Sequence, residues 1–421
     1  MISKLLILGV DTSTQSILNY TKKNDIYTII TDYREPQDSP LKLVADDYWM
    51  INITDLDQLE AKCRETGVTA VMAGNHEMCL DSAKELCHRL GFPFYASDYA
   101  WRTARNKLLF KETCLEVGLE IPRTYHVNDS LDEIDLTQIK YPVMVKPSDQ
   151  MAGRGISQCF NEEELRIACQ KARDYSTNGR IVVEEYVNGD ELSIGCYVDQ
   201  GVSHIVAVTD AIKREISGRK SIMLYSCRSR YFDECIEAIE EKIHKFIKAL
   251  AIQNGCLFFQ CIRKDGHYYF LEFGYRISGA GLWMLTEKVY GFNYVEWMVD
   301  LALGQKPSIN WDLAGQCFEN KHCMVYLYWV KPGKVGAIRK IDAQNLPENV
   351  SITIERFKPG DEIAQTSDFY QVGWYIQVIA ESAKEIADKI RFINDNLQLL
   401  DEDGNNMMIP FDDYDYLLKY C

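Results

Sequence analysis

The chain has 421 residues, of which 47% are hydrophobic and 26% charged, the balance of an ordinary folded protein with more than one domain. Its 62 acidic and 46 basic side chains give a formal net charge of −16, which argues against nucleic acid or an anionic membrane as the main partner. Fourteen scattered cysteines without a CxxC pair, no signal-peptide pattern and no long apolar run predict a cytoplasmic protein with reduced thiols.

Short apolar runs alternate with helical patterns over the first hundred residues. The runs are KLLILGV, YTIITD and GVTAVMAGN (4–10, 27–32 and 67–75). Strands that alternate with helices predict βαβ units, so we expect a doubly wound parallel-sheet domain over residues 1–100. The first turn, GVDTST, does not match GxGxxG, which disfavours a nicotinamide-dependent dehydrogenase.

A single helix is expected from Asp98 to Gly118, followed by several strands. The expected strands are 141–147, 180–187, 191–198 and 203–210. The loop SDQMAGRGI (148–156) carries two glycines, so its backbone N–H groups could close over phosphates with Lys146 as a point charge. A lysine before a proline at a strand end is also commonly a solvated side chain, and the glutamates of EEYVNGDE (184–191) could equally face solvent.

The pattern changes after about residue 310. Three strands (323–330, 350–357 and 372–380) are separated by Pro/Gly turns and followed by a helical segment, 381–397. This arrangement predicts a small antiparallel sheet with a helix on one face, over residues 311–421.

A hairpin over residues 256–273 contains Gln260 and Glu272, and its loop decides whether they share a face. A three-residue loop, 264–266, would put both on one face together with Phe270 and Gly274. The opposite face would then carry Leu257, Phe259, Leu271 and Phe273. A two-residue turn would instead separate Gln260 from Glu272.

Glu272 needs a partner because an unpaired buried carboxylate is unfavourable. One reading is a salt bridge to Arg276 or to a nearby lysine. The other is a hard-cation site, to which Gln260 adds a neutral oxygen. The hairpin alone leaves both readings open.

Taken together, these features occur in an informative order. Lys107, Lys146, the glycine loop, the 184–191 glutamates and the spacing Q-x11-E-x3-R (260–276) resemble the ATP-grasp superfamily over essentially the whole chain. The most similar branch is the large subunit of carbamoyl phosphate synthetase and related carboxylate–amine ligases. The tail, with GKVGAI, RFKPGDEI and GWYIQVIAESAKEIADKI, is similar to the C-terminal domain of biotin carboxylase and L-amino acid ligases.

The resemblance implies a division into three parts with mixed α/β and α+β architecture. These are a pre-ATP-grasp domain (1–100), a split ATP-grasp domain (101–310) with a lid at about 113–187, and a biotin carboxylase-like domain (311–421).

The resemblance also implies site roles. Nucleotide-binding residues would be Lys107, Lys146, Ser148, Gly153, Gly155, Glu184, Glu185, Val187 and Glu191. Magnesium would be held by Gln260 and Glu272, while Arg276 and Lys146 would be catalytic, with Arg276 as the planar anchor for a carboxylate. The pattern departs at Gly274, where the family normally has an asparagine that binds metal.

The implied activity is that of an ATP- and Mg²⁺-dependent ligase, which activates a small-molecule carboxylate as an acyl phosphate for attack by an amine. A homodimer is compatible with this expectation. Two alternatives stay open: carbamoyl phosphate-type chemistry on bicarbonate or carbamate, and an ATP-binding module without turnover, which Gly274 favours.

Overall fold

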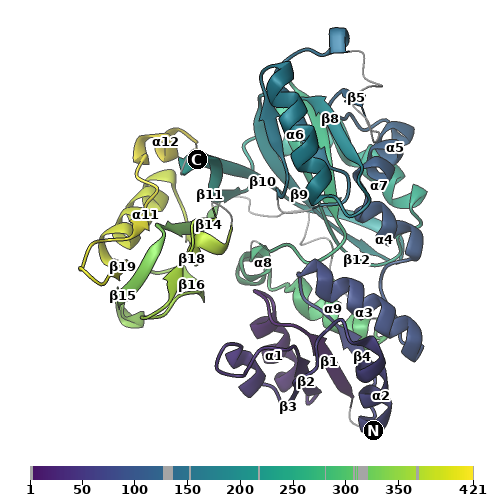
Figure 1. Ribbon diagram of the computed structural model, residues 1–421. Helices are drawn as coiled ribbons and strands as arrows, with labels where there is room; N and C mark the ends of the chain where they lie inside the picture. The colour runs from purple at the N-terminus through teal and green to yellow at the C-terminus, as the bar shows by residue number, and fades with distance from the viewer. Residues whose placement is uncertain are drawn as a thin grey trace.

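A four-stranded parallel sheet forms the N-terminal part of the computed structural model, which describes residues 3–126, 136–150, 153–216, 219–279, 281–306, 309, 311, 321–366 and 369–420 (Figure 1). The strand order is β3-β2-β1-β4. The strands are β1 (Lys4–Leu8), β2 (Tyr27–Thr31), β3 (Asp47–Trp49) and β4 (Ala70–Met72). The helices are α1 (Thr14–Lys23), α2 (Leu56–Thr66) and α3 (Glu77–Leu90).

Both faces of this sheet are covered. Leu5 of β1 lies in one buried cluster with Ile17 of α1, whereas Leu6 lies in a second cluster with Leu59 of α2 and Leu80 of α3. Successive strand residues point to opposite faces, so helices must pack on both sides. The expected doubly wound parallel sheet is confirmed.

The helix expected from Asp98 to Gly118 is in fact two helices, α4 (Asp98–Ala104) and α5 (Lys107–Val117). The break is at Asn106, whose backbone is extended (φ −137°, ψ 107°) and whose side chain accepts hydrogen bonds from the N–H groups of Leu108 and Leu109. Asparagine is a favoured N-cap because it satisfies such unpaired donors. The expectation of one helix was therefore wrong, and the break makes Lys107 the first residue of α5.

A separate four-stranded antiparallel sheet carries the glycine loop. Its order is β5-β8-β6-β7, and α6 (Glu162–Tyr175) packs on it around a small core of its own. The strands are β5 (Thr124–His126), β6 (Val143–Pro147), β7 (Ser157–Cys159) and β8 (Ile181–Glu185). This sheet lies at the top of the view in Figure 1.

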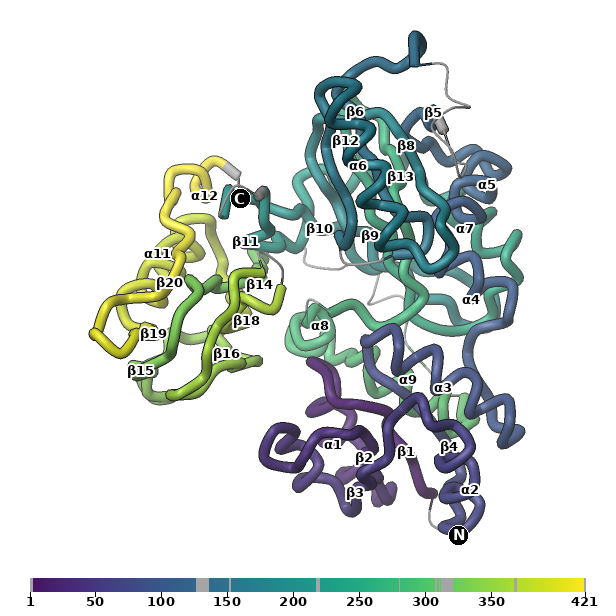
Figure 2. Tube along the Cα trace, in the orientation of Figure 1, coloured from purple at the N-terminus to yellow at the C-terminus, as the bar shows by residue number. Residues whose placement is uncertain are grey.

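A long antiparallel sheet links the centre of the molecule to its C-terminal part, with described strands in the order β13-β12-β9-β10-β11-β14-β18-β16 and β20 beside β14. The strands are β9 (Asp190–Asp199), β10 (Val202–Ile216), β11 (Arg219–Cys227), β12 (Gly255–Lys264), β13 (His267–Gly274), β14 (His322–Val330), β16 (Val350–Glu355), β18 (Val372–Ala380) and β20 (Met408–Ile409). Because β11 pairs directly with β14, the sheet runs across the expected boundary near residue 310, and the domain limits stay a prediction. Figure 2 shows the C-terminal part, in yellow-green, reached through β11 and β14.

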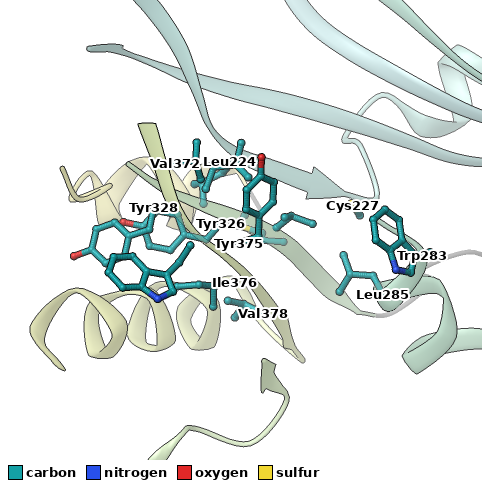
Figure 3. Packing of buried hydrophobic residues seen from close by; sticks show 14 of the residues in the cluster. Leu224, Cys227, Trp283, Leu285, Tyr326, Tyr328, Val372, Tyr375, Ile376 and Val378 are labelled. Carbon is teal, nitrogen blue, oxygen red and sulfur yellow. The ribbon is translucent and has the colours of Figure 1, made fainter. Parts of the chain in front are cut away.

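The remaining elements cover these sheets. They are α7 (Phe232–Ala249), α8 (Leu282–Tyr290), α9 (Tyr294–Ala302), α11 (Ala383–Asn396), α12 (Tyr414–Tyr420), and a sheet of β15 (Gly333–Arg339), β17 (Glu362–Ile363) and β19 (Gln398–Asp401). Trp283 and Leu285 of α8 share a buried cluster with Tyr326 of β14 and Ile376 of β18 (Figure 3). In the described part of the chain, no helix is both long and apolar enough to cross a membrane.

Candidate active site

The hairpin of β12 and β13 has a two-residue turn, which is one of the two loop types that the sequence left open. Lys264 lies opposite His267, and the turn residues Asp265 and Gly266 have positive φ angles of 53° and 81°. This geometry is typical of an Asp-Gly hairpin turn. With a regular ladder, this turn would place Gln260 and Glu272 on opposite faces.

A bulge brings the two residues back together. The register shifts next to Gln260, so that Cys261 faces Phe270 but Gln260 faces Glu272, with Leu271 as the extra residue. A bulge of one residue reverses the side-chain alternation beyond it. Gln260 and Glu272 are therefore direct cross-strand partners. Phe270, which a three-residue loop would have put beside them, is completely buried on the other face.

Lys107 reaches the same place from α5. Its Nζ lies 3.5 Å from Oε2 of Glu272, and it also donates a hydrogen bond to the carbonyl of Gln150 at the start of the glycine loop. A small cavity beside this pair is lined by Thr103, Ala104, Arg105, Asn106, Lys107, Phe110, Glu272 and Phe273. Glu272 thus has a lysine, not Arg276, as its near cation, at a separation longer than a normal hydrogen bond.

Behind the glycine loop, a buried carboxylate lies between two lysines. Glu184 of β8 accepts a hydrogen bond from Lys146 of β6, and its Oε2 lies 2.7 Å from Nζ of Lys111 on α5. Burial opposes ionisation of Glu184, but the two ammonium groups outweigh it and lower the pKa of the carboxyl, while burial lowers the pKa of Lys111. Two lysines against one glutamate leave one net positive charge here, beside the loop expected to cover phosphates.

Lys111 was not among the expected site residues. It lies one helical turn after Lys107, and residues four apart share a helix face. The four-residue spacing could therefore have predicted that Lys111 lies on the same side of α5 as Lys107. Glu184 itself was expected among the nucleotide-binding residues, and in the described structure its carboxylate is paired with Lys111 and Lys146.

The glycine loop is described in part. Gly153 and Gly155 have φ angles of 75° and 71°, and a Cβ on Gly155 would lie 2.8 Å from Pro147, so both conformation and space favour glycine there. Ser148 is fully buried, and its hydroxyl donates to Asn178 at 3.1 Å, which places it at the base of the loop.

Three further residues expected to bind nucleotide lie from the last residue of β8 to the second residue of β9. Glu185 accepts a 2.9 Å hydrogen bond from the backbone N–H of Arg123, Val187 is buried, and Glu191 forms an ion pair with Lys213. Their roles toward a nucleotide stay a prediction, as do those of the other residues of the site.

Arg276 reaches across to the N-terminal domain. Its Nη2 lies 3.1 Å from the carboxylate of Glu77, the first residue of α3, which also lies 3.2 Å from Arg105. The carboxyl ends of parallel strands are the usual ligand-binding edge of such a sheet, and Glu77 follows β4 there. Sequence reasoning missed Glu77, since nothing local links it to an arginine 199 positions away.

The donor set on the hairpin is small. Among the residues that the structure describes, no three or more His, Cys, Asp or Glu side chains gather as metal ligands. Gln260 and Glu272, one amide oxygen and one carboxylate, are donors that a hard cation such as Mg²⁺ accepts, with water or phosphate completing the sphere.

Comparison with known proteins agrees with this geometry. A family model described as an ATP-grasp domain matches residues 139–283. The large chain of carbamoyl phosphate synthase from Thermotoga sp. (strain RQ2) is 28% identical over 212 residues, which is 48% of this chain and 19% of that protein. The large chain from Thermomicrobium roseum is 24% identical over 333 residues, or 72% of this chain and 30% of that one. The chain thus spans less than a third of these curated relatives.

Solved structures match over nearly the whole chain. Phosphoribosylglycinamide synthetase from Anaerococcus prevotii has a TM-score of 0.75 at 21% identity, covering 95% of this chain and 100% of that one. L-amino acid ligase from Bacillus licheniformis has a TM-score of 0.78 at 19% identity, covering 95% and 98%. The biotin carboxylase domain of 2-oxoglutarate carboxylase from Hydrogenobacter thermophilus has a TM-score of 0.79 at 17% identity, covering 100% and 99%. Residues 139–283 therefore match an ATP-grasp domain, and the chain as a whole shares its fold with these solved structures.

Proposed function

We propose that the protein is an ATP- and Mg²⁺-dependent ligase that activates a carboxylate as an acyl phosphate for attack by an amine. The observation that carries the proposal is the direct pairing of Gln260 with Glu272, with Nζ of Lys107 3.5 Å from the carboxylate. Two oxygen donors and a lysine on one side are the groups needed to hold a metal–polyphosphate.

Each residue then has a task set by its position. Lys107, at the first position of α5, and Lys146, at the end of β6, bind the phosphates that the glycine loop covers. When bound by Gln260 and Glu272, magnesium would neutralise charge on the phosphoryl group. The loop excludes water, which would otherwise hydrolyse an acyl phosphate.

Arg276 is proposed to bind the substrate carboxylate. Its guanidinium lies 3.1 Å from the carboxylate of Glu77, and this contact with a carboxylate supports the proposal. Glu77 would have to share the guanidinium with that substrate or leave it.

Arg276→Lys is expected to lower kcat/KM for the carboxylate by about 100-fold, because an ammonium cannot form the bidentate pair that a planar guanidinium forms. The dissociation constant for ATP should change less than threefold, since the phosphates are proposed to be bound by Lys107 and Lys146 and not by Arg276. Steady-state kinetics at varied carboxylate concentration measure kcat/KM, and calorimetric titration with ATP measures the dissociation constant. Equal losses for both ligands would mean that Arg276 serves the fold or the nucleotide instead.

The direct test of the activity is ADP release in a screen of carboxylate–amine pairs, with bicarbonate as a separate arm. ADP release that requires both a carboxylate and an amine supports the ligase. Release with bicarbonate alone favours carbamoyl phosphate-type chemistry, the reaction suggested by the name of the sequence relatives. ATP binding without any substrate-dependent release leaves the non-catalytic module. A cytoplasmic location stays a prediction, and so does a homodimer, although the Hydrogenobacter neighbour is described as a dimer.

A further inference from the structure

One face of the hairpin carries two adjacent cross-strand pairs. Gln260 faces Glu272, and two residues away Phe258 faces Gly274, so all four positions lie on the same side. A Cβ built on Gly274 would lie 2.3 Å from both Cε1 and Cζ of Phe258. No real Cβ approaches that closely, so the ring covers the space that any side chain at position 274 would need.

Space, not backbone conformation, explains this glycine. Gly274 is not among the glycines with positive φ, and it is the last residue of β13. A larger residue could therefore adopt the backbone, and the three atoms nearest to its Cβ would all belong to the ring of Phe258.

Arg276 also contacts the Phe258 ring. The guanidinium carbon is 5.0 Å from the centroid of the Phe258 ring, within the range of a cation–π contact. Phe258 thus lies next to the Gln260–Glu272 pair on one face of the hairpin, and its ring contacts the permanent cation of Arg276. The ring offers no lone pair to a metal ion, and Arg276 would repel one.

We propose that Phe258 restricts this site to a single divalent cation, held by Gln260 and Glu272, and fills the position from which a third side-chain oxygen would serve a second ion. The inference rests on the proposed metal–nucleotide function. Phe258 acts here as a positioning residue, because its ring also supports the guanidinium of Arg276.

The test counts Mn²⁺ on the full-length chain by equilibrium dialysis with a non-hydrolysable ATP analogue at equal concentration in both chambers. One Mn²⁺ per chain is expected for the unaltered protein. Phe258→Ala/Gly274→Asn removes the ring and adds an amide oxygen, and it should bind two. Phe258→Ala alone should still bind one, and Gly274→Asn alone should bind one while its melting temperature falls, because the side chain must displace the ring.

The outcomes separate the two proposals. Two ions on the unaltered protein would overturn the single-cation inference and leave the ligase proposal standing. No ion on the unaltered protein, under conditions where the analogue binds, would overturn the metal site itself and with it both proposals. A folded double variant that still binds one ion would show that Phe258 is not what restricts the site.

Discussion

Glu272→Ala is expected to abolish ATP turnover and to remove the Mg²⁺ dependence of nucleotide binding. The carboxylate faces Gln260 and is the only charged oxygen donor of that cross-strand pair, so its loss leaves a neutral amide to hold the cation. A fall in kcat of roughly 100-fold or more is expected, the scale on which removing one preorganised electrostatic group acts. The ADP release rate and calorimetric titration of nucleotide with and without Mg²⁺ measure the two effects.

Glu272 is also the near anion of Lys107, whose side chain is only 6% exposed. The melting temperature must therefore be compared, so that a damaged fold is not mistaken for a lost ligand. Glu272→Gln keeps an oxygen donor and should retain part of the Mg²⁺ dependence, while Glu240→Ala, at an exposed position of α7, should change nothing. Unchanged turnover in Glu272→Ala would remove this residue from the metal site.

The pairing of Gln260 with Glu272 shows what hairpin sequence can and cannot predict. The strands and the presence of an Asp-Gly turn follow from local composition. The bulge at Leu271 does not follow from local composition. It leaves Leu271 without a cross-strand partner and allows Phe270 to be buried, where its ring packs against Phe259 with centroids 5.8 Å apart. That gain depends on the surrounding core, which no window of a dozen residues contains.

Lys107 illustrates a missed local signal. Periodicity favoured one helix through residues 98–118, and an asparagine inside it has only a small effect on such a pattern. The structure uses Asn106 as an N-cap, which begins a new helix and turns Lys107 toward Glu272. The N-cap preference of asparagine could have predicted the break.

The contact between Glu77 and Arg276 lies beyond sequence reasoning of this kind. Glu77 begins α3 beside the parallel sheet, and Arg276 follows β13 of the long antiparallel sheet, so their ion pair depends on how these two parts of the fold meet. The order of motifs indicated the ATP-grasp architecture, but it did not indicate that the carboxylate of Glu77 contacts Arg276, which the structure shows. The substrate end of the site is therefore less predictable than its nucleotide end.

Glu184→Leu is expected to lower the free energy of unfolding by about 3–5 kcal/mol, because it leaves two buried ammonium groups without their anion. The side chains of Lys111 and Lys146 are 6% and 9% exposed, so water can do little to stabilise their charges once the carboxylate of Glu184 is removed. Urea unfolding at pH 7 measures the change. Lys111→Met is the matched comparison, since it leaves one lysine for one glutamate and should be milder.

The pH dependence of that variant distinguishes lost charge compensation from lost packing. In the unaltered protein the pKa of Glu184 is lowered on folding, so its stabilisation is present at neutral pH and is lost only as the pH falls through that lowered value. The pKa of Lys111 is already lowered by burial, and without Glu184 it should fall further. The folded variant then binds fewer protons than the unfolded chain, so its stability should rise from pH 7 to pH 9 by more than that of the unaltered protein. A deficit that stays constant over this range would mean that the glutamate serves mainly to fill space between the strand and the helix.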